Sequence, residues 1–309
     1  GVNGETELAR IGALVTGQSG DPRLTLSIVL LVAGLGFKIA AVPFHLWAPD
    51  VYEGAPTPVA AFLSVGSKAA AFALILRLFA EGLAAARADW SVIFQVLAFL
   101  TMTAGNIAAL TQSNTKRMLA YSSVAHAGYL LIGVTAGTPR GIAAVLFYLA
   151  AYAAMQLGAF AVVVLLRRAD VVGDELRDLS GLHARQPLAA FAMLVCLLSL
   201  GGMPPTAGFM GKFRLFGAAI DAGHVALAVA GVLNSVLSLY YYMRVVMFMY
   251  VRPAVPAAVE GVVVPPMLRV AMATAAAATL LLGLYPTLVF EAADRSARLF
   301  QPLLGMALP

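Results

Sequence analysis

Long apolar segments, separated mostly by short polar turns, fill almost the whole chain and constrain its fold more than any other feature. The 309 residues are 61% hydrophobic and 11% charged, whereas soluble domains carry about 25% charged residues. A water-soluble protein of this length would not cover so much apolar surface with so few charges. The bilayer is therefore the expected solvent, and the expected class is an all-α, polytopic transmembrane helix bundle.

Apolar length, together with polar or Pro/Gly boundaries, divides the chain into eight predicted spans. Their predicted limits are 24–52, 57–81, 90–111, 117–136, 140–166, 187–220, 224–251 and 267–290. We expect a single transmembrane domain over residues 1–309, because neither of the longer linkers, 167–186 and 252–266, reads as a separate domain. The first linker has room for a short surface helix. The chain starts with a polar loop and not with a signal peptide.

Prolines interrupt two of these spans near their middle, and each break has an ionisable residue close by. The first break is at Pro43, and the second lies within residues 201–205, which read GGMPP. A proline removes a backbone donor and frees a carbonyl group, which in lipid needs a neighbour or a water molecule. Broken helices at corresponding places in two halves are typical of internally repeated transporters. We therefore expect both breaks to line a hydrated interior.

Three of the four lysines lie inside these apolar spans, whereas all fifteen acidic residues lie in loops or at span ends. Lys38 precedes the first break, Lys68 lies eleven residues into its span, and Lys212 follows the second break. A lysine at bilayer depth costs about 2.5 kcal/mol or more on insertion scales. We expect all three to be buried and to mark a proton or ion pathway. The alternatives are snorkelling of Lys38 and anchoring of Lys212 at the interface.

Two histidines are candidate proton relays, because histidine titrates near neutrality. His45 lies at the first break and His126 lies in the fourth span; structural hydrogen bonding is the alternative for both. Tyr241, one of three consecutive tyrosines, is a candidate for holding water, with packing as the favoured interpretation. No set of His, Cys or carboxylate residues has metal-ligand spacing. The lone Cys196 is expected to pack within an apolar run.

The basic residues in the loops predict the orientation of the chain. Loops on one side collect nine Lys and Arg residues, and loops on the other side collect seven. We expect the richer side to be cytoplasmic, with both ends of the chain on the opposite side. Lys116 lies in a polar turn and is expected to belong to this solvated positive cluster. No basic stripe with interleaved aromatics indicates nucleic-acid binding.

Three stretches of this sequence carry a family resemblance. They are residues 35–59, which contain LGFK and VPFHLWAPDVYEGAPTPV, residues 105–123 (GNIAALTQSNTKRMLAYSS) and residues 201–209 (GGMPPTAGF). Together they resemble the proton-translocating, antiporter-like membrane subunits of respiratory complex I. DVYEGAP, together with Ser67-Lys68 in place of a histidine, resembles the subunit N branch of that family. The resemblance covers nearly the whole chain.

The resemblance implies a fourteen-helix fold with two inverted five-helix repeats, in which the seventh and twelfth helices are broken. The eight spans would correspond to helices seven to fourteen. Lys38 and Lys212 would be the lysines of the two broken helices, Lys68 the connecting lysine on the eighth helix, and His45 a relay. In the family, the first lysine pairs with a glutamate on the fifth helix. That helix has no counterpart in this sequence.

The resemblance also implies a function, a location and partners. The chain would translocate protons as a subunit of H⁺-translocating NADH:quinone oxidoreductase, with no cofactor of its own. NAD, FMN, Fe–S clusters and quinone would be bound elsewhere in the complex. The implied partners are subunits M and K and membrane lipid, in the bacterial cell (inner) membrane rather than the mitochondrial one. Two alternatives remain: a Na⁺/H⁺ antiporter subunit of the same superfamily, and a non-conducting membrane scaffold.

Overall fold

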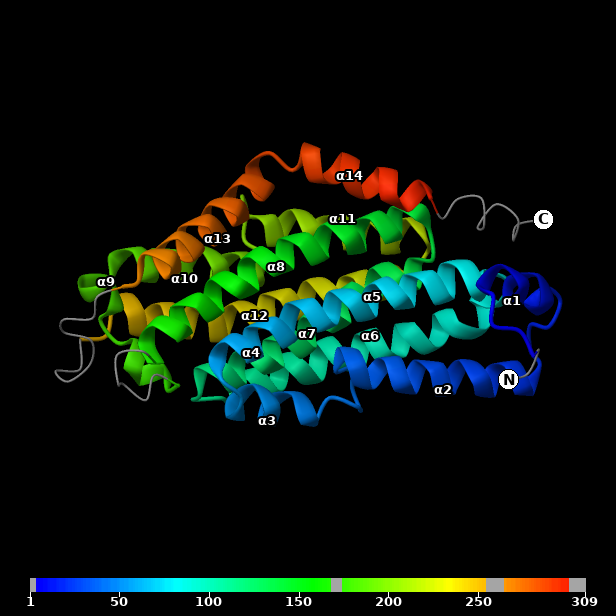
Figure 1. Cartoon of the computed structure of the whole chain (residues 1–309), viewed down its shortest axis with the longest axis horizontal. Helices are drawn as coiled ribbons and strands as arrows, with labels where there is room; N and C mark the ends of the chain where they lie inside the picture. The colour runs from blue at the N-terminus through cyan, green and yellow to red at the C-terminus, as the bar shows by residue number, and fades with distance from the viewer. Residues whose placement is uncertain (1–3, 168–173, 254–263, 300–309) are drawn as a thin grey trace.

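The computed structural model describes residues 4–167, 174–253 and 264–299, mainly as a bundle of long helices (Figure 1). No strand forms in these ranges. Residues 1–3, 168–173, 254–263 and 300–309, which include part of each predicted linker, lie outside the described residues. The helices are α1 (Leu8–Val15), α2 (Pro22–Ile39), α3 (Trp47–Gly54), α4 (Thr57–Phe62), η1 (Leu63–Ser67), α5 (Lys68–Arg77), η2 (Leu78–Gly82), η3 (Ala84–Ala86), α6 (Arg87–Leu110), α7 (Thr115–Ala136), α8 (Pro139–Arg167), η4 (Leu176–Leu179), α9 (Leu182–Arg185), α10 (Pro187–Gly201), α11 (Ala207–Asp221), α12 (Val225–Tyr250), α13 (Pro266–Leu284) and α14 (Thr287–Arg298).

Seven described helical segments are long and apolar enough to cross a membrane. They are Pro22–Ile39, Thr57–Gly82, Ala84–Leu110, Thr115–Ala136, Pro139–Leu166, Val225–Tyr250 and Pro266–Leu284. The remaining predicted span, the sixth, is a broken one formed by α10 and α11, and neither half is long enough by itself. The prediction of a polytopic helix bundle is therefore confirmed. Apart from the last span, the observed ends lie within a few residues of the predicted ones.

The first predicted break separates α2 from α3. Helix α2 ends at Ile39, and Ala40 adopts a left-handed conformation with φ 59°. The groups freed there find partners in the protein, as expected in lipid: Trp47 Nε1 donates to the Phe37 carbonyl at 2.9 Å, and the Val42 N–H donates to Thr101 Oγ1 at 3.0 Å. Hydrogen bonds thus join the end of α2 to α3 and the residues of the break to α6.

The second predicted break separates α10 from α11. Helix α10 ends at Gly201, and Gly202 carries the chain through a left-handed turn with φ 86°, which glycine adopts without the steric cost that a side chain would add. Across the break, the Gly208 N–H donates to Ser199 Oγ at 2.9 Å. The last turn of α10 and the first turn of α11 are therefore held in contact.

The second membrane span contains two π-helical turns. The first, η1, ends directly before Lys68, and the second, η2, ends the span. A π-helical turn places one extra residue in the helix and occurs frequently at functional sites. The extra residue turns the side chain of Lys68 to a different face from the one that an uninterrupted α-helix would give it.

Two ends of the chain depart from the predicted pattern. The eighth span ends at Leu284 and not near residue 290, because Pro286 disfavours helical geometry at the residue before it. The following helix, α14, is amphipathic, and Asp294 on it pairs with Arg214 of α11 at 2.8 Å. Near the start, the residues between the predicted polar loop (1–6) and the first span form a short helix, α1, where Leu8 packs on Gly82.

The described part of the 167–186 linker contains a short 3₁₀ turn, η4, and the short helix α9. This linker therefore contains a short helix, as the sequence analysis allowed.

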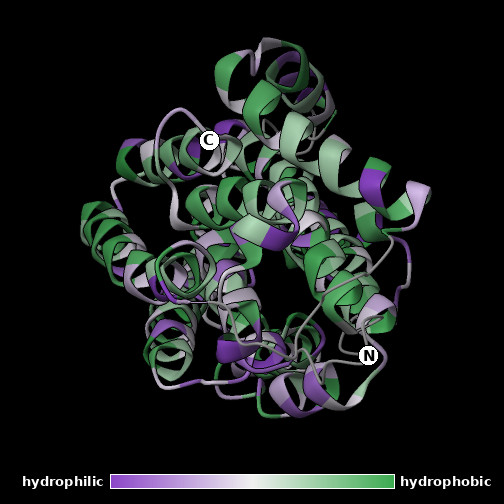
Figure 2. Ribbon diagram, turned by 90° about the vertical axis from the view of Figure 1, so that its left-hand side faces the viewer, coloured by the Kyte–Doolittle hydropathy of each residue, from purple (hydrophilic) through white to green (hydrophobic). Residues whose placement is uncertain are grey.

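Helix α7 lies at the centre of the bundle. Of its 22 residues, 20 are buried, and α3, α6, α8 and α11 pack around it. The outer helices expose large apolar side chains, such as Leu30 and Leu233, each 65% exposed. In the view along the bundle, hydrophobic residues cover outward as well as inward helix faces (Figure 2). This distribution suits a bundle surrounded by lipid.

Glycines allow α6 and α7 to approach closely. A Cβ atom on Gly128 would lie 2.5 Å from the Met102 backbone nitrogen, and one on Gly105 would lie 2.7 Å from the Ala125 nitrogen. Small residues at such positions let helix backbones pack in the membrane. Backbone atoms cannot rotate away as a side chain can, so a larger residue would push the two helices apart.

We predict that Gly128→Ala destabilises the protein by about 1–3 kcal/mol, the usual range for overpacking a core. The matched control is Gly34→Ala on α2, where an added Cβ meets no atom within 4 Å. The thermal midpoint of the purified protein in detergent, compared at one scan rate, measures the effect. Equal midpoints for the two variants would contradict this account of the α6–α7 contact.

Candidate functional site

Lys68 is a buried cation at the first residue of α5, with 4% of its surface exposed. Its ammonium group donates hydrogen bonds to the Ser123 carbonyl and, at 2.7 Å, to the Ser123 hydroxyl on α7. Nζ also lies 5.4 Å from the centre of the Tyr152 ring on α8. The predicted burial of Lys68 is confirmed, and oxygen atoms and an aromatic face hold its charge.

Lys212 is a second buried cation, on α11, with 3% of its surface exposed. Its Nζ donates to the carbonyls of Leu200 and Gly201 at 3.0 and 3.2 Å. These carbonyls belong to the last turn of α10, which has no helical partner for them and carries the negative end of the helix dipole. Nζ also lies 4.4 Å from the centre of the Tyr129 ring. The predicted burial of Lys212 is therefore confirmed.

His126 lies on α7 between the two lysines and is 1% exposed. Its ring centre is 5.1 Å from that of Tyr152, which Lys68 approaches, and 5.5 Å from that of Tyr129, which Lys212 approaches. One titratable side chain is thus shared between two buried amines that come from different halves of the chain.

Tyrosine hydroxyl groups occupy both nitrogen atoms of the histidine ring. Nδ1 of His126 lies 2.7 Å from the Tyr148 hydroxyl, and Nε2 lies 3.2 Å from the Tyr242 hydroxyl. Tyr242 also shares a hydrogen bond of 2.5 Å with Ser122. Because hydroxyl groups both donate and accept, either tautomer of the ring is satisfied, and the histidine can change tautomer or charge without losing its partners.

Tyr241, the tyrosine singled out from the sequence, lies next to this group without contacting His126 in any described bond. It is fully buried and donates to Asn106 Oδ1 at 3.0 Å. Asn106 in turn donates to the Tyr129 hydroxyl and to Asn234 on α12, each at 3.1 Å. Tyr241 therefore holds the amide that positions the ring beside Lys212.

Lys38 is not buried, and that part of the prediction is wrong. Helix α2 turns only one face to the bundle, the face of Ile28, Val32 and Ile39, and Lys38 lies outside that face and is exposed. Phe37 beside it is 54% exposed. The apolar length of the segment predicted the span correctly, but length alone does not indicate which face of a helix contacts neighbouring helices.

His45 lies in the break between α2 and α3, as predicted, and is partly exposed. Its Nδ1 atom is buried and has no hydrogen-bond partner among the described residues. Among the described residues, no hydrogen bond or ring contact joins it to Lys68, His126 or Lys212. The structure therefore leaves its relay role as a prediction.

Lys116 departs from the prediction in the opposite direction. The sequence indicates a solvated loop, but Lys116 is fully buried at the start of α7. Its Nζ donates to the Ala55 carbonyl at 3.1 Å and lies 3.8 Å from Asp174 Oδ2. The next residue, Arg117, pairs with Asp50 and Glu53 of α3. Carboxylates distant in sequence pair with both residues, and the charge of Lys116 does not face water as predicted, whereas Arg117 stays partly exposed.

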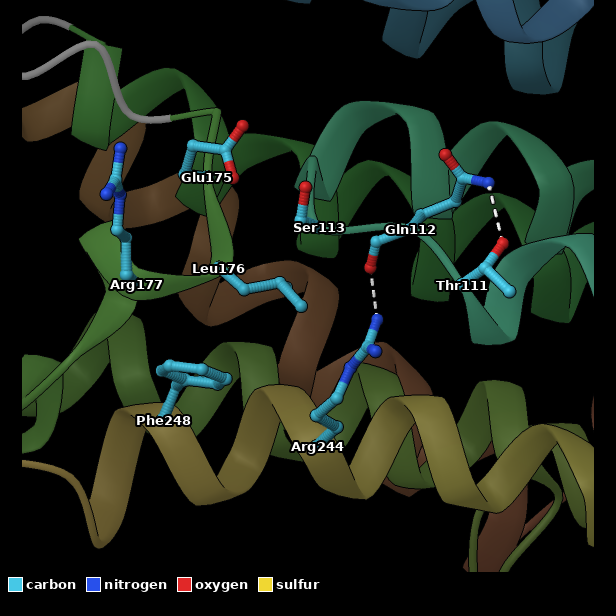
Figure 3. A pocket seen from close by; sticks show the side chains of 8 residues that line it. All are labelled: Thr111, Gln112, Ser113, Glu175, Leu176, Arg177, Arg244 and Phe248. Atoms are coloured by element: carbon cyan, nitrogen blue, oxygen red, sulfur yellow. Dashed lines mark hydrogen bonds between the residues drawn. The ribbon is translucent and has the colours of Figure 1, made fainter.

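A surface pocket of about 450 Å³ opens at the same end of the bundle, between the end of α6, residues 175–177 and α12. Figure 3 shows Arg244 reaching from α12 to the carbonyl of Gln112; it also donates to the Leu110 carbonyl at 2.9 Å. Arginine thereby caps the end of α6. None of the predicted site residues lines this pocket, and we assign it no part in the buried chain.

Sequence reasoning missed the aromatic and polar residues around the lysines: Ser123, Tyr129, Tyr148, Tyr152 and Tyr242. A signal for two of them is present, because Tyr148, Tyr152 and Gln156 recur at intervals of four residues in an otherwise apolar segment and so share one helix face. Across the described ranges, no group of three or more His, Cys, Asp or Glu residues is placed to hold a metal ion. Cys196 is buried and packs near Gly158.

Comparison with known proteins gives consistent matches. A sequence model of the family described as "NADH:quinone oxidoreductase/Mrp antiporter, TM" matches residues 1–238. NADH-quinone oxidoreductase subunit N from Trichlorobacter lovleyi is 48% identical over 301 residues, which cover 97% of this chain and 62% of that protein. The chain thus spans about three-fifths of the length of the curated relatives that it matches.

Two solved structures show the same fold. A chain of respiratory complex I from Thermus thermophilus with bound aureothin matches with a TM-score of 0.77 and 38% identity, over 93% of this chain and 65% of that one. A chain of the Mrp complex from Dietzia sp. matches with a TM-score of 0.86 and 25% identity, over 98% of this chain and 65% of that one.

We predict that Tyr242→Phe destabilises the protein by about 1–3 kcal/mol, because Ser122 and His126 would each lose a buried partner. Tyr240→Phe is the matched control, since Tyr240 is 65% exposed and adjacent in sequence. Thermal unfolding in detergent measures both variants. If Tyr242→Phe unfolds at the temperature of the control, the hydroxyl does not hold this group together.

Proposed function

This chain belongs to the NADH:quinone oxidoreductase/Mrp antiporter family, and we propose that it translocates protons as a membrane subunit of a NADH:quinone oxidoreductase. The observation that carries the proposal is the pair of buried amines, Lys68 and Lys212, on either side of a buried histidine. A charge at membrane depth is costly and marks a functional pathway by default. A 48% identical relative that carries the name of subunit N supports the choice of enzyme.

The arrangement supports a step in which a proton moves between the two lysines by way of His126. A neutral amine can accept a proton, and an imidazole with hydroxyl partners on both nitrogens can accept one and release another. When one lysine is charged, Coulomb repulsion raises the electrostatic cost of a proton on its neighbour. Electrostatic change elsewhere in the complex, driven by redox work, would then shift the proton from one lysine to the other.

The redox chemistry in this proposal takes place in other subunits. We propose that this chain binds no NAD, FMN, Fe–S cluster or quinone and that it acts in the translocase part of the enzyme. Its proposed neighbours are the antiporter-like subunit M and the small subunit K, and its proposed location is the bacterial inner membrane. The Thermus chain that it matches is itself part of respiratory complex I.

A second candidate function is cation–proton antiport in a complex of the Mrp type. The fold similarity to a chain of the Dietzia Mrp complex favours it, with a TM-score of 0.86. The sequence identity of 25% to that chain is lower than the 38% to the Thermus chain. Ion transport by the complete protein in the absence of NADH would favour antiport over the first proposal.

We predict that Lys68→Met and Lys212→Met, each in the complete protein within its assembled complex, strongly lower proton translocation per NADH oxidised. Methionine fills the space of the lysine stem but carries no exchangeable proton. Lys68→Arg is also expected to lower proton translocation, because a guanidinium group keeps its proton and its charge. This variant distinguishes a requirement for proton exchange from a requirement for positive charge alone. Acidification of vesicles by the reconstituted complex measures the effect, and oxidation of NADH by a soluble acceptor controls for assembly. Full pumping in both Met variants would reject the proposal.

We also predict that Lys38→Met lowers proton translocation in the complete protein. Lys38 faces away from the described bundle, and an amine on that face requires a partner from outside it. The family resemblance supplies one, a glutamate on the fifth helix. Unchanged pumping rate and stoichiometry in the Lys38→Met complex would remove Lys38 from the pathway and leave the roles of Lys68 and Lys212 intact.

A further inference from the structure

Asn106 on α6 is a fully buried amide whose polar atoms all have partners in the protein. Its Nδ2 atom donates to the Tyr129 hydroxyl at 3.1 Å and to the side-chain and backbone oxygens of Asn234 at 3.1 and 3.2 Å. Its Oδ1 atom accepts from the Tyr241 hydroxyl at 3.0 Å. A buried polar cluster that is satisfied in this way holds its members in fixed positions.

The neighbours of Asn106 determine which of its two polar atoms faces α12. A backbone carbonyl can only accept a hydrogen bond, so the atom beside the Asn234 carbonyl is the Asn106 nitrogen. The Tyr129 hydroxyl lies at the same nitrogen and therefore accepts from it, whereas Tyr241 donates to the oxygen. The direction of the Asn106–Tyr129 bond is thus set by a group that cannot reverse its role.

Tyr129 extends this anchor from α6 to Lys212. Its ring centre lies 4.4 Å from Lys212 Nζ, within the range of a cation–π contact. The hydroxyl on the same ring is the group that Asn106 holds. The ring is fully buried, and a buried hydroxyl that loses its donor is destabilised unless it moves toward another partner. The position of the ring against the ammonium group therefore depends on Asn106.

A second tyrosine, Tyr152, shows that this anchor is particular to the Lys212 site. Its ring centre lies 5.4 Å from Lys68 Nζ, and its hydroxyl has no hydrogen-bond partner among the described residues. Tyr152 and Tyr129 are both at most 1% exposed. Burial by itself therefore does not require an amide to hold a tyrosine in this bundle, and the contact with Asn106 needs another explanation.

The ionisable groups around Lys212 are few, although α7, α8, α10, α12 and α13 all pack on α11. Those that lie close to Lys212, or to residues that it contacts or adjoins, are His126, Tyr129, Tyr148 and Tyr242. Helix α10 contains no Asp, Glu, Lys, Arg or His, and Arg269 lies in the first turn of α13, whose other end borders the break. On α11 itself, Arg214 pairs with Asp294. The groups that surround Lys212 are thus one histidine and three tyrosines, none of which is negatively charged at neutral pH.

We propose that Asn106 is a positioning residue for proton transfer at Lys212: it anchors the Tyr129 hydroxyl and so holds the ring against the ammonium group. The anchored ring stabilises the protonated amine relative to the neutral one. Asn106 exchanges no proton itself, because it acts through Tyr129. This role rests on the proposed function of Lys212 and adds to it a residue of α6, a helix that carries no lysine.

The test measures proton pumping in vesicles as a function of pH, with the complete protein in its assembled complex. In Asn106→Leu the ring is no longer anchored, so the protonated form of Lys212 loses stabilisation. The alkaline limb of the pH profile is therefore expected to move to lower pH, by about half to one pH unit. Tyr129→Phe keeps the ring, removes only the anchored hydroxyl and leaves Asn106 its bonds to Asn234. It is expected to give the same shift, and it decides the question if Asn106→Leu does not assemble.

Thr103→Val is the matched control. Thr103 lies one turn before Asn106 on α6, and its hydroxyl accepts a hydrogen bond from Asn234 Nδ2 at 3.1 Å. The variant loosens the same contact between α6 and α12 but leaves the hydrogen bonds of Asn106 in place. It is expected to keep the pH profile of the unaltered complex even where its thermal midpoint falls, because a purely structural bond between helices does not act on the proton of Lys212.

The double variant Asn106→Leu/Tyr129→Phe shows whether the amide acts through the ring. If it does, the double variant shifts the profile no further than Tyr129→Phe alone, whereas additive shifts would overturn the inference. If Tyr129→Phe keeps the unaltered profile, the positioning role is wrong even where Lys212→Met fails to pump. If Lys212→Met pumps normally, the proposed function itself fails.

Discussion

The interaction on which the rest of this structure depends is the contact between a buried lysine and the carbonyl groups that end a broken helix. Lipid offers no water to the last turn of α10, so its carbonyls need donors from within the protein. Lys212 supplies them, with Nζ 3.0 and 3.2 Å from two terminal carbonyls. The same contact gives the ammonium group oxygen partners and the negative end of a helix dipole. Break and cation thus stabilise each other, and neither would be tolerated at this depth alone.

Aromatic side chains extend this arrangement across the bundle. Lys212 and Lys68 each lie over a tyrosine ring, and both rings flank His126. No described carboxylate forms an ion pair with either lysine, so hydroxyl groups, carbonyls and ring faces provide the stabilisation. These partners are weaker than a carboxylate. A weakly stabilised charge is easier to move, which is what a proton-transfer chain requires and a structural salt bridge does not.

Much of the fold follows from residues that can be read in order along the chain. Apolar length predicts the spans, and Pro43 and Gly201–Pro205 predict the two breaks, because backbone geometry and hydrogen bonding in lipid are local constraints. The burial of Lys68 and Lys212 follows from the same reasoning. The same reasoning gives the wrong burial for Lys38 and Lys116. Lys38 was predicted to be buried, but it lies on the outward face of an apolar span; Lys116 was predicted to face water, but it lies beneath distant segments.

The sequence by itself determined the solvent of this protein, the number of spans, the positions of the breaks and the presence of costly cations. These properties depend on composition and on neighbours within a few residues. Only the tertiary structure decided which cations share a site. Ser123 and Tyr152 meet Lys68 because α7 packs against α5 and α8 packs against α4 and η1. The rotation of one helix against another is set by packing over the whole bundle, and no local pattern of residues encodes it.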